Sequence, residues 1–94
     1  MNKYTTTILL KNDLTNEQIK LVISKIQNYI NNGGTIYKIE DLGLKKLAYD
    51  VKKYKEAYFY VIHFENKPEC IHHLERLYRI TDEVLKFIII KLED

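Results

Sequence analysis

The hydrophobic positions of the chain follow a helical spacing in its first half. Four isoleucines between residues 19 and 30 succeed one another in steps of four, three and four, which places them on one face of an α-helix. Thr15, followed three residues later by Gln18, has the sequence of a capping box. Gly33 and Gly34 predict the end of this helix, because glycine adopts the left-handed backbone of a helix terminus without steric cost.

A second helix is predicted between residues 66 and 80. Pro68 suits its first turn, where a missing backbone N–H costs no hydrogen bond. The polar residues 81–83 end it. The apolar side chains that form its inner face are Ile71, Leu74, Leu77 and Tyr78.

Four segments rich in β-branched, aromatic and other apolar residues are predicted to be strands. They are residues 3–11, 35–51, 57–65 and 84–92. We expect Gly43 to interrupt the second segment with a bulge or bend. Residues 52–56 are polar and predict a hairpin tip, whereas the large residues on both faces of 57–65 are typical of a central strand.

The order of these elements is strand, helix, strand, strand, helix, strand. Both helices must bury their apolar faces against one sheet, and right-handed crossovers restrict how the strands connect. We therefore predict an α+β fold of the ferredoxin-like type, βαββαβ, with a four-stranded antiparallel sheet and two helices on one face. The strand at 35–51 is expected at a sheet edge. A single domain is expected to span residues 1–94.

The charge of the chain is informative in its distribution and not in its total. The 94 residues carry a net charge of +2, which by itself does not indicate a nucleic-acid partner. Between residues 45 and 55, however, there are five lysines and one acidic residue, with Tyr49 and Tyr54 among them. Such a stretch suits a surface that faces phosphates. A solvated edge strand protected by lysines is the alternative interpretation.

Catalytic and ligand-binding motifs are not recognisable in the sequence. It contains no Ser-His-Asp set, Gly-rich phosphate loop or catalytic acid pair. Cys70 and His73 share a predicted helix face next to His72, but a tetrahedral metal site needs about four ligands. No apolar run approaches the roughly 18 residues of a membrane-spanning helix. We predict no enzyme, metal, cofactor, small-molecule substrate or membrane partner.

Two motifs give the chain a family resemblance. Residues 40–49 have the sequence EDLGLKKLAY, which contains an acidic pair, a glycine, two basic residues and Leu-Ala-Tyr. Residues 79–87 have the sequence RITDEVLKF and are followed by Lys91, and Tyr4 lies at the expected distance from the start. In these features the chain resembles the bacterial-type ribosomal protein S6 family. It departs from the family at Asp50, where proline is usual.

The resemblance implies a structural role in the small ribosomal subunit. Members bind the central domain of the small-subunit (16S-type) rRNA together with ribosomal protein S18, as a heterodimer that joins the RNA during assembly. The implied location is the cytoplasmic ribosome of a bacterium, and an organelle ribosome, such as that of a plastid, is the alternative.

The resemblance and the charge distribution together predict two RNA-binding patches. One is the hairpin tip, with Lys52, Lys53 and Lys55. The other lies where the first and last strands are neighbours in the sheet, so that four side chains are expected to meet on one surface, with Arg79 nearby. These four are Lys3, Tyr4, Lys86 and Lys91.

The edge strand is predicted to bind the partner protein. An exposed strand edge offers unpaired backbone groups, and its outward apolar side chains become buried in the complex. The predicted interface residues are Leu42, Leu44, Lys45, Lys46, Leu47 and Tyr49.

Two other functions fit the same fold. A stand-alone RNA-recognition module binds single-stranded RNA by stacking bases on aromatic residues of a central strand. Here the glycines of that motif are missing from 57–65, so we expect most rings of Tyr58, Phe59, Tyr60 and Phe64 to be core or partner interface. The second alternative is a regulatory ligand-binding domain, against which the lysine cluster argues.

Overall fold

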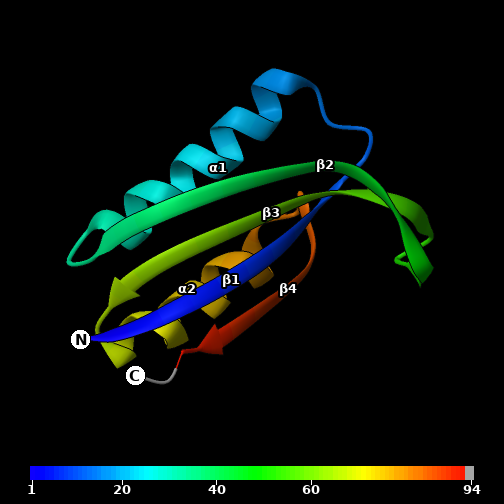
Figure 1. Ribbon diagram of the computed structural model, residues 1–94. Helices are drawn as coiled ribbons and strands as arrows, with labels where there is room; N and C mark the ends of the chain where they lie inside the picture. The colour runs from blue at the N-terminus through cyan, green and yellow to red at the C-terminus, as the bar shows by residue number, and fades with distance from the viewer. Residues whose placement is uncertain (93–94) are drawn as a thin grey trace.

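The computed structural model describes residues 1–92 and contains the six elements in the predicted order (Figure 1). In chain order these are β1 (Asn2–Lys11), α1 (Asn16–Asn31), β2 (Thr35–Val51), β3 (Tyr54–Asn66), α2 (Pro68–Ile80) and β4 (Val84–Lys91). The helix signals in the sequence are confirmed. Thr15 caps α1 in a capping box, in which the Thr15 hydroxyl accepts from the Gln18 N–H at 3.2 Å and the Gln18 side chain accepts from the Thr15 N–H at 2.8 Å.

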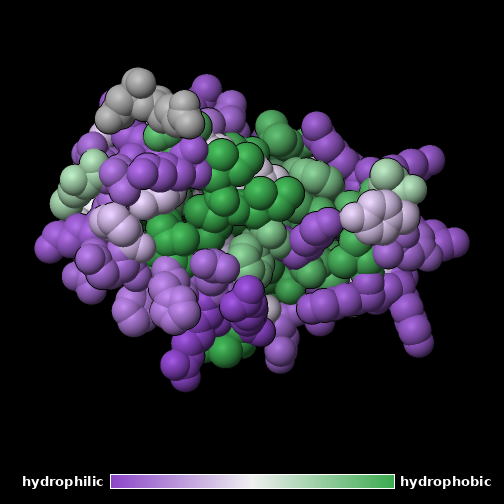
Figure 2. All heavy atoms as spheres, turned by 90° about the horizontal axis from the view of Figure 1, so that it is seen from below, coloured by the Kyte–Doolittle hydropathy of each residue, from purple (hydrophilic) through white to green (hydrophobic). Residues whose placement is uncertain are grey.

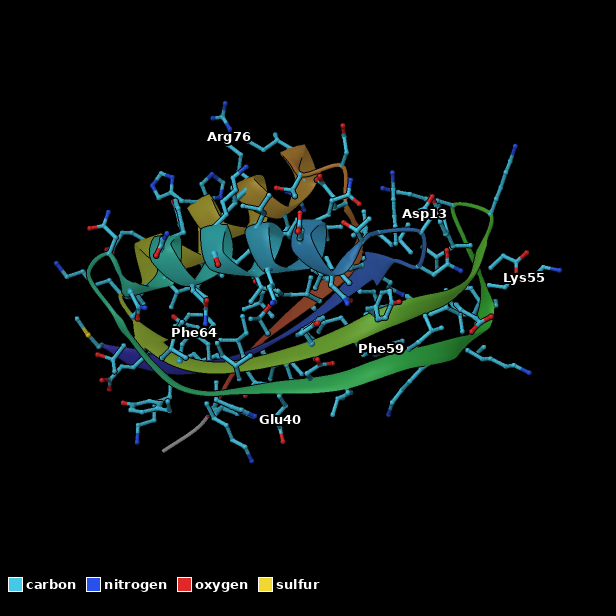
Figure 3. The ribbon with its side chains drawn as sticks, turned by 90° about the horizontal axis from the view of Figure 1, so that it is seen from above. Asp13, Glu40, Lys55, Phe59, Phe64 and Arg76 are labelled. Carbon is cyan, nitrogen blue, oxygen red and sulfur yellow. The ribbon has the colours of Figure 1, made fainter. Side chains whose placement is uncertain are left out.

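The four strands form one antiparallel sheet in the order β2-β3-β1-β4. Both helices cover the same face of this sheet, and the opposite face carries no helix among residues 1–92 (Figure 3). The prediction of a ferredoxin-like α+β fold is therefore confirmed. So is the edge position of β2, while β4 forms the other edge.

The main core lies between the sheet and the helices. On β1 every second side chain from Tyr4 to Leu10 is buried there, as the two-residue period of a strand requires. The isoleucine stripe of α1 and the residues Leu74, Leu77 and Tyr78 of α2 complete it. Figure 3 shows Phe64 inside this layer, whereas Glu40 lies on the uncovered side of the sheet.

A close contact fixes the end of α1 against β3. The Asn66 side chain, which is buried, donates a hydrogen bond of 2.8 Å to the Ile30 carbonyl in the last turn of the helix. Gly34 leaves room for this side chain, since a Cβ at Gly34 would collide with Asn66 and with the Glu65 carbonyl. The predicted helix end is confirmed, with Gly33 in the left-handed region at φ +96°.

The β2–β3 hairpin confirms one local prediction and corrects another. The expected irregularity at Gly43 is a bulge through which β2 continues, with Gly43 at φ +76° and its N–H bonded to Asp41 at 2.9 Å. The tip, in contrast, is shorter than residues 52–56. Val51 pairs with Tyr54, so only Lys52 and Lys53 form the turn.

The hairpin bends over the uncovered face of the sheet. Lys46 pairs with Glu56 and Val51 with Tyr54, so the four residues 47–50 of β2 lie opposite one residue of β3. The extra residues on β2 increase the bend of the hairpin, as the extra residue of a β-bulge does. A second apolar cluster lies on the uncovered face beneath the bend, with Leu9, Ala57 and Leu85 buried and Leu47, Val51, Tyr54 and Phe59 packed against them.

Candidate nucleic-acid interface

Three of the predicted RNA-binding residues surround one hollow of about 280 Å³. Lys52 reaches it from the hairpin tip, Arg79 from the end of α2 and Lys86 from β4. The other lining residues are Tyr78, Val84, Leu85 and Phe87, and none of the lining residues is acidic. We call this site the basic hollow.

The cations of the basic hollow are oriented by aromatic rings. The Lys86 ammonium donates a hydrogen bond of 3.0 Å to the Tyr49 hydroxyl and lies 5.5 Å from the centre of that ring. This hydrogen bond lowers the pKa of the Tyr49 phenol. Arg79 lies 5.7 Å from the centre of the Phe87 ring and pairs with Glu75 at 3.6 Å on the exposed side of α2. The bend in β2 therefore brings Tyr49 into contact with Lys86 on β4, which is the opposite edge of the sheet.

The expected meeting of Lys3, Tyr4, Lys86 and Lys91 on one surface was wrong. Tyr4 is buried in the main core, and Lys91 lies opposite it on the same face of the sheet. Lys3 and Lys86 point to the other face, because neighbouring residues of a strand alternate between faces. Lys86 pairs with Leu9, six residues along β1 from Lys3, which is about 20 Å. The prediction placed the strands correctly but not their register.

The remaining lysines of the hairpin are exposed to solvent. Lys53 shares the two-residue turn with Lys52, and Figure 3 shows Lys55 pointing away from the hairpin end. Neither lines the basic hollow. The structure thus separates Lys52 from the two lysines with which the sequence grouped it.

The edge strand presents most of its predicted interface residues. Leu42 and Leu44 are exposed at the edge, Leu44 to 48%, and Tyr49 is exposed near the hairpin end. Lys45 and Lys46 are exposed as well. Leu47 differs, because its side chain packs partly buried against the second apolar cluster, and it is less available to a partner.

A polar network crosses the uncovered face and holds β2 to the sheet. His63 of β3 lies between Thr5 of β1, at 3.1 Å, and Glu40 of β2, at 3.0 Å. Lys38 adds an ion pair of 3.3 Å to the same carboxylate. The hydrogen bond from His63 and the charge of Lys38 lower the pKa of Glu40.

The aromatic residues of β3 pack as expected and do not form an open stacking platform. Phe64 is buried, and Tyr58 and Tyr60 are partly buried against the main core. Phe59 packs against the second cluster. The hydroxyl of Tyr60 donates to Asp41 at 3.3 Å. These rings therefore contribute to packing, which argues against a stand-alone RNA-recognition module.

An exposed apolar strip on β4 was missed in the sequence. Ile88 and Ile90 are 47% and 56% exposed on the uncovered face, and Leu92 follows them. Figure 2, seen from below, shows hydrophobic side chains gathered in the middle with hydrophilic ones around them. The signal was available, because alternate residues of an edge strand must face the side without helices.

The chain has one free thiol and, within residues 1–92, neither a cluster of metal ligands nor a membrane-spanning helix. Within residues 1–92, no three His, Cys, Asp or Glu side chains gather as a metal site. Cys70 is a free thiol whose pKa is raised by partial burial. No helix in the part of the chain that the structure describes is long and apolar enough to cross a membrane.

Comparisons with known proteins agree with the sequence motifs. The family model described as Ribosomal protein S6 matches residues 3–91. The small ribosomal subunit protein bS6 of a Nitratiruptor species is 43% identical over 94 residues, which cover 99% of this chain and 73% of that protein. The bS6 of Helicobacter pylori (strain G27) is 44% identical over 97 residues, which cover 99% of this chain and 66% of that protein.

A solved structure supports the same relationship at the level of the fold. The crystal structure of 30S ribosomal protein S6 from Thermotoga maritima superposes on this chain with a TM-score of 0.92. The two are 25% identical, and the superposition covers 97% of this chain and 87% of that one.

Proposed function

The chain belongs to the ribosomal protein S6 family of the small subunit, a non-enzymatic family, and from this we propose that it binds the central domain of small-subunit rRNA together with ribosomal protein S18. In this role it supplies shape and charge during assembly of the subunit. Because the relatives named above are bacterial, we propose the cytoplasmic ribosome of a bacterium as its location.

The basic hollow is the observation that carries the RNA part of the proposal. Lys52, Arg79 and Lys86 come from three separate elements and converge without an acidic side chain among the lining residues. Phosphate contacts by lysine and arginine provide most of the affinity of proteins for nucleic acids. Lys3 and Lys91, at the other end of the sheet and on its two opposite faces, are proposed as two further RNA contacts.

The free edge of β2 supports the protein part of the proposal. Its backbone groups are not paired on the outer side by another strand among residues 1–92. Leu42 and Leu44 provide exposed apolar surface, and Lys45 and Lys46 beside them keep the edge from pairing with unrelated strands. We propose that ribosomal protein S18 covers this edge.

Binding of S18 and RNA is tested by co-purification from a mixture of the tagged chain, S18 and a central-domain rRNA fragment. Leu44→Asp places a charge in the proposed interface and is expected to weaken S18 binding by about tenfold or more. Leu21→Asp is the matched control, because Leu21 is 71% exposed on α1, away from the β2 edge. Recovery of neither S18 nor RNA with the unchanged chain refutes the proposal.

A further inference from the structure

The basic hollow has an arrangement of charge that the fold alone does not require. The basic side chains of Lys52, Arg79 and Lys86 line a space of about 280 Å³ whose apolar lining includes Phe87. Arg79 pairs with Glu75 at 3.6 Å outside the hollow, and the Lys86 ammonium donates to the Tyr49 hydroxyl at 3.0 Å. Like charges held together repel, so an anion between them is stabilised by all three.

The backbone at the hairpin tip is unfavourable for the residues that occupy it. Lys52 and Lys53 have φ angles of 50° and 72°, in the left-handed region that favours glycine and asparagine. Two-residue hairpin turns of this kind prefer Asn-Gly. Lysine therefore adds backbone strain at this turn. What lysine supplies at position 52, and what asparagine or glycine would lack, is a charged ammonium group.

Two of the three cations are also held in place before any ligand arrives. Tyr49 accepts from Lys86, and the Phe87 ring lies near Arg79. Tyr78 packs against Phe87 with ring centres 4.9 Å apart, which fixes the floor of the hollow. A site prepared in this way loses less side-chain freedom when it binds a ligand.

We propose that the basic hollow binds one phosphate group of the RNA backbone, shared by Lys52, Arg79 and Lys86. This inference rests on the proposed function. The guanidinium group of Arg79 offers paired donors that match phosphate oxygens, and the two lysines add point charges. The volume is several times the roughly 30 Å³ that a water molecule occupies, so a phosphate group fits. Lys53 and Lys55 lie outside this site.

A double-mutant cycle tests whether the cations share one phosphate. The affinity of the chain with S18 for the central-domain rRNA fragment is measured for Lys52→Ala, Lys86→Ala and the double variant. Each single change is expected to weaken binding about tenfold. Because both act on the same phosphate, the double variant is expected to lose far less than the hundredfold product. The slope of log affinity against log salt concentration should decrease in all three variants by the amount expected for the loss of about one phosphate contact.

Matched controls separate sharing from a general loss of charge. Lys55→Ala removes the same charge outside the hollow, so its combination with Lys86→Ala should be multiplicative. Lys86→Arg keeps the charge and is expected to retain most of the affinity. Urea unfolding of each variant verifies that the fold is intact.

The outcomes distinguish this inference from the proposed function. If the unchanged chain binds RNA with S18 but Lys52→Ala and Lys86→Ala combine multiplicatively, or have no effect, the shared phosphate site is refuted and the proposed function stands. If the unchanged chain binds no RNA, both are refuted. Inorganic phosphate is tested separately by NMR: signals of Arg79 and Lys86 that shift with phosphate, without competition between phosphate and RNA, assign the hollow to a free anion and overturn the proposal.

Discussion

A hydrogen bond between Thr6 and Tyr78 ties β1 to α2 in the middle of the core. The two hydroxyl oxygens are 3.1 Å apart, and both side chains are almost completely inaccessible to solvent. Burial raises the pKa of the Tyr78 phenol far above its ordinary value of 10.0. Because Tyr78 also lines the basic hollow and packs on Phe87, this bond connects the stability of the core to the shape of the candidate site.

Removing one partner of this pair should cost much more than removing both. Tyr78→Phe keeps the ring in place but leaves the Thr6 hydroxyl buried without its partner, at an expected cost of about 1–3 kcal/mol. Thr6→Val leaves the phenol unpaired in the same way. The double variant removes both polar groups and is expected to lie close to the stability of the unchanged chain, because no buried group remains unsatisfied. Because the two single costs are absent from the double variant, the expected coupling energy is the sum of the single costs, about 2 kcal/mol or more in magnitude.

Urea unfolding followed by circular dichroism measures these differences. With a denaturant dependence of about 1–3 kcal/mol per molar urea for a small domain, each single variant should shift the midpoint by about 1 M. Thr7→Val is the control, since Thr7 faces the other side of β1 and its side chain makes no hydrogen bond within residues 1–92. Single costs below about 0.5 kcal/mol, or strictly additive costs in the double variant, would refute this reasoning.

The remaining predictions concern three other contacts. Gly34→Ala should lower the free energy of unfolding by about 2 kcal/mol or more in a urea titration, because the added methyl displaces the buried Asn66 side chain from the end of α1. Lys52→Asn combined with Lys53→Gly should raise stability by about 1–2 kcal/mol, since these residues tolerate the left-handed turn, and should weaken RNA binding in a filter assay. The pKa of Glu40 is lowered in the fold, so its carboxylate stabilises the folded state at pH values above the ordinary pKa of 4.5. This contribution is lost as the pH falls through the lowered pKa. Glu40→Gln should therefore make the free energy of unfolding less dependent on pH in the range below 4.5.

Each of these predictions has an outcome that contradicts it. A Gly34→Ala protein as stable as the unchanged chain would show that the close approach to Asn66 relaxes freely. A turn variant that binds RNA as tightly as the original would remove Lys52 from the interface. For Glu40→Gln, acid unfolding identical to that of the unchanged chain would mean that the network on the uncovered face adds nothing to stability.

The secondary structure and the fold class were determined by the sequence. The isoleucine stripe of α1 and the capping box at Thr15 are local patterns, and the six elements form at the predicted places because these patterns depend only on nearby residues. The order of elements then left few topologies, since both helices had to cover one sheet. The family motif at residues 40–49 gave the relationship that the comparisons confirm.

The site was decided by tertiary structure. Lys86 and Lys91 were grouped because they share a strand, yet they point to opposite faces, and the register with β1 sets which residues each one meets. The basic hollow depends on the bend of the hairpin, which brings Lys52 to Arg79 and Lys86. That bend arises from unequal strand lengths and from burial of apolar residues on the uncovered face, and pairing between distant segments is not encoded in a local pattern.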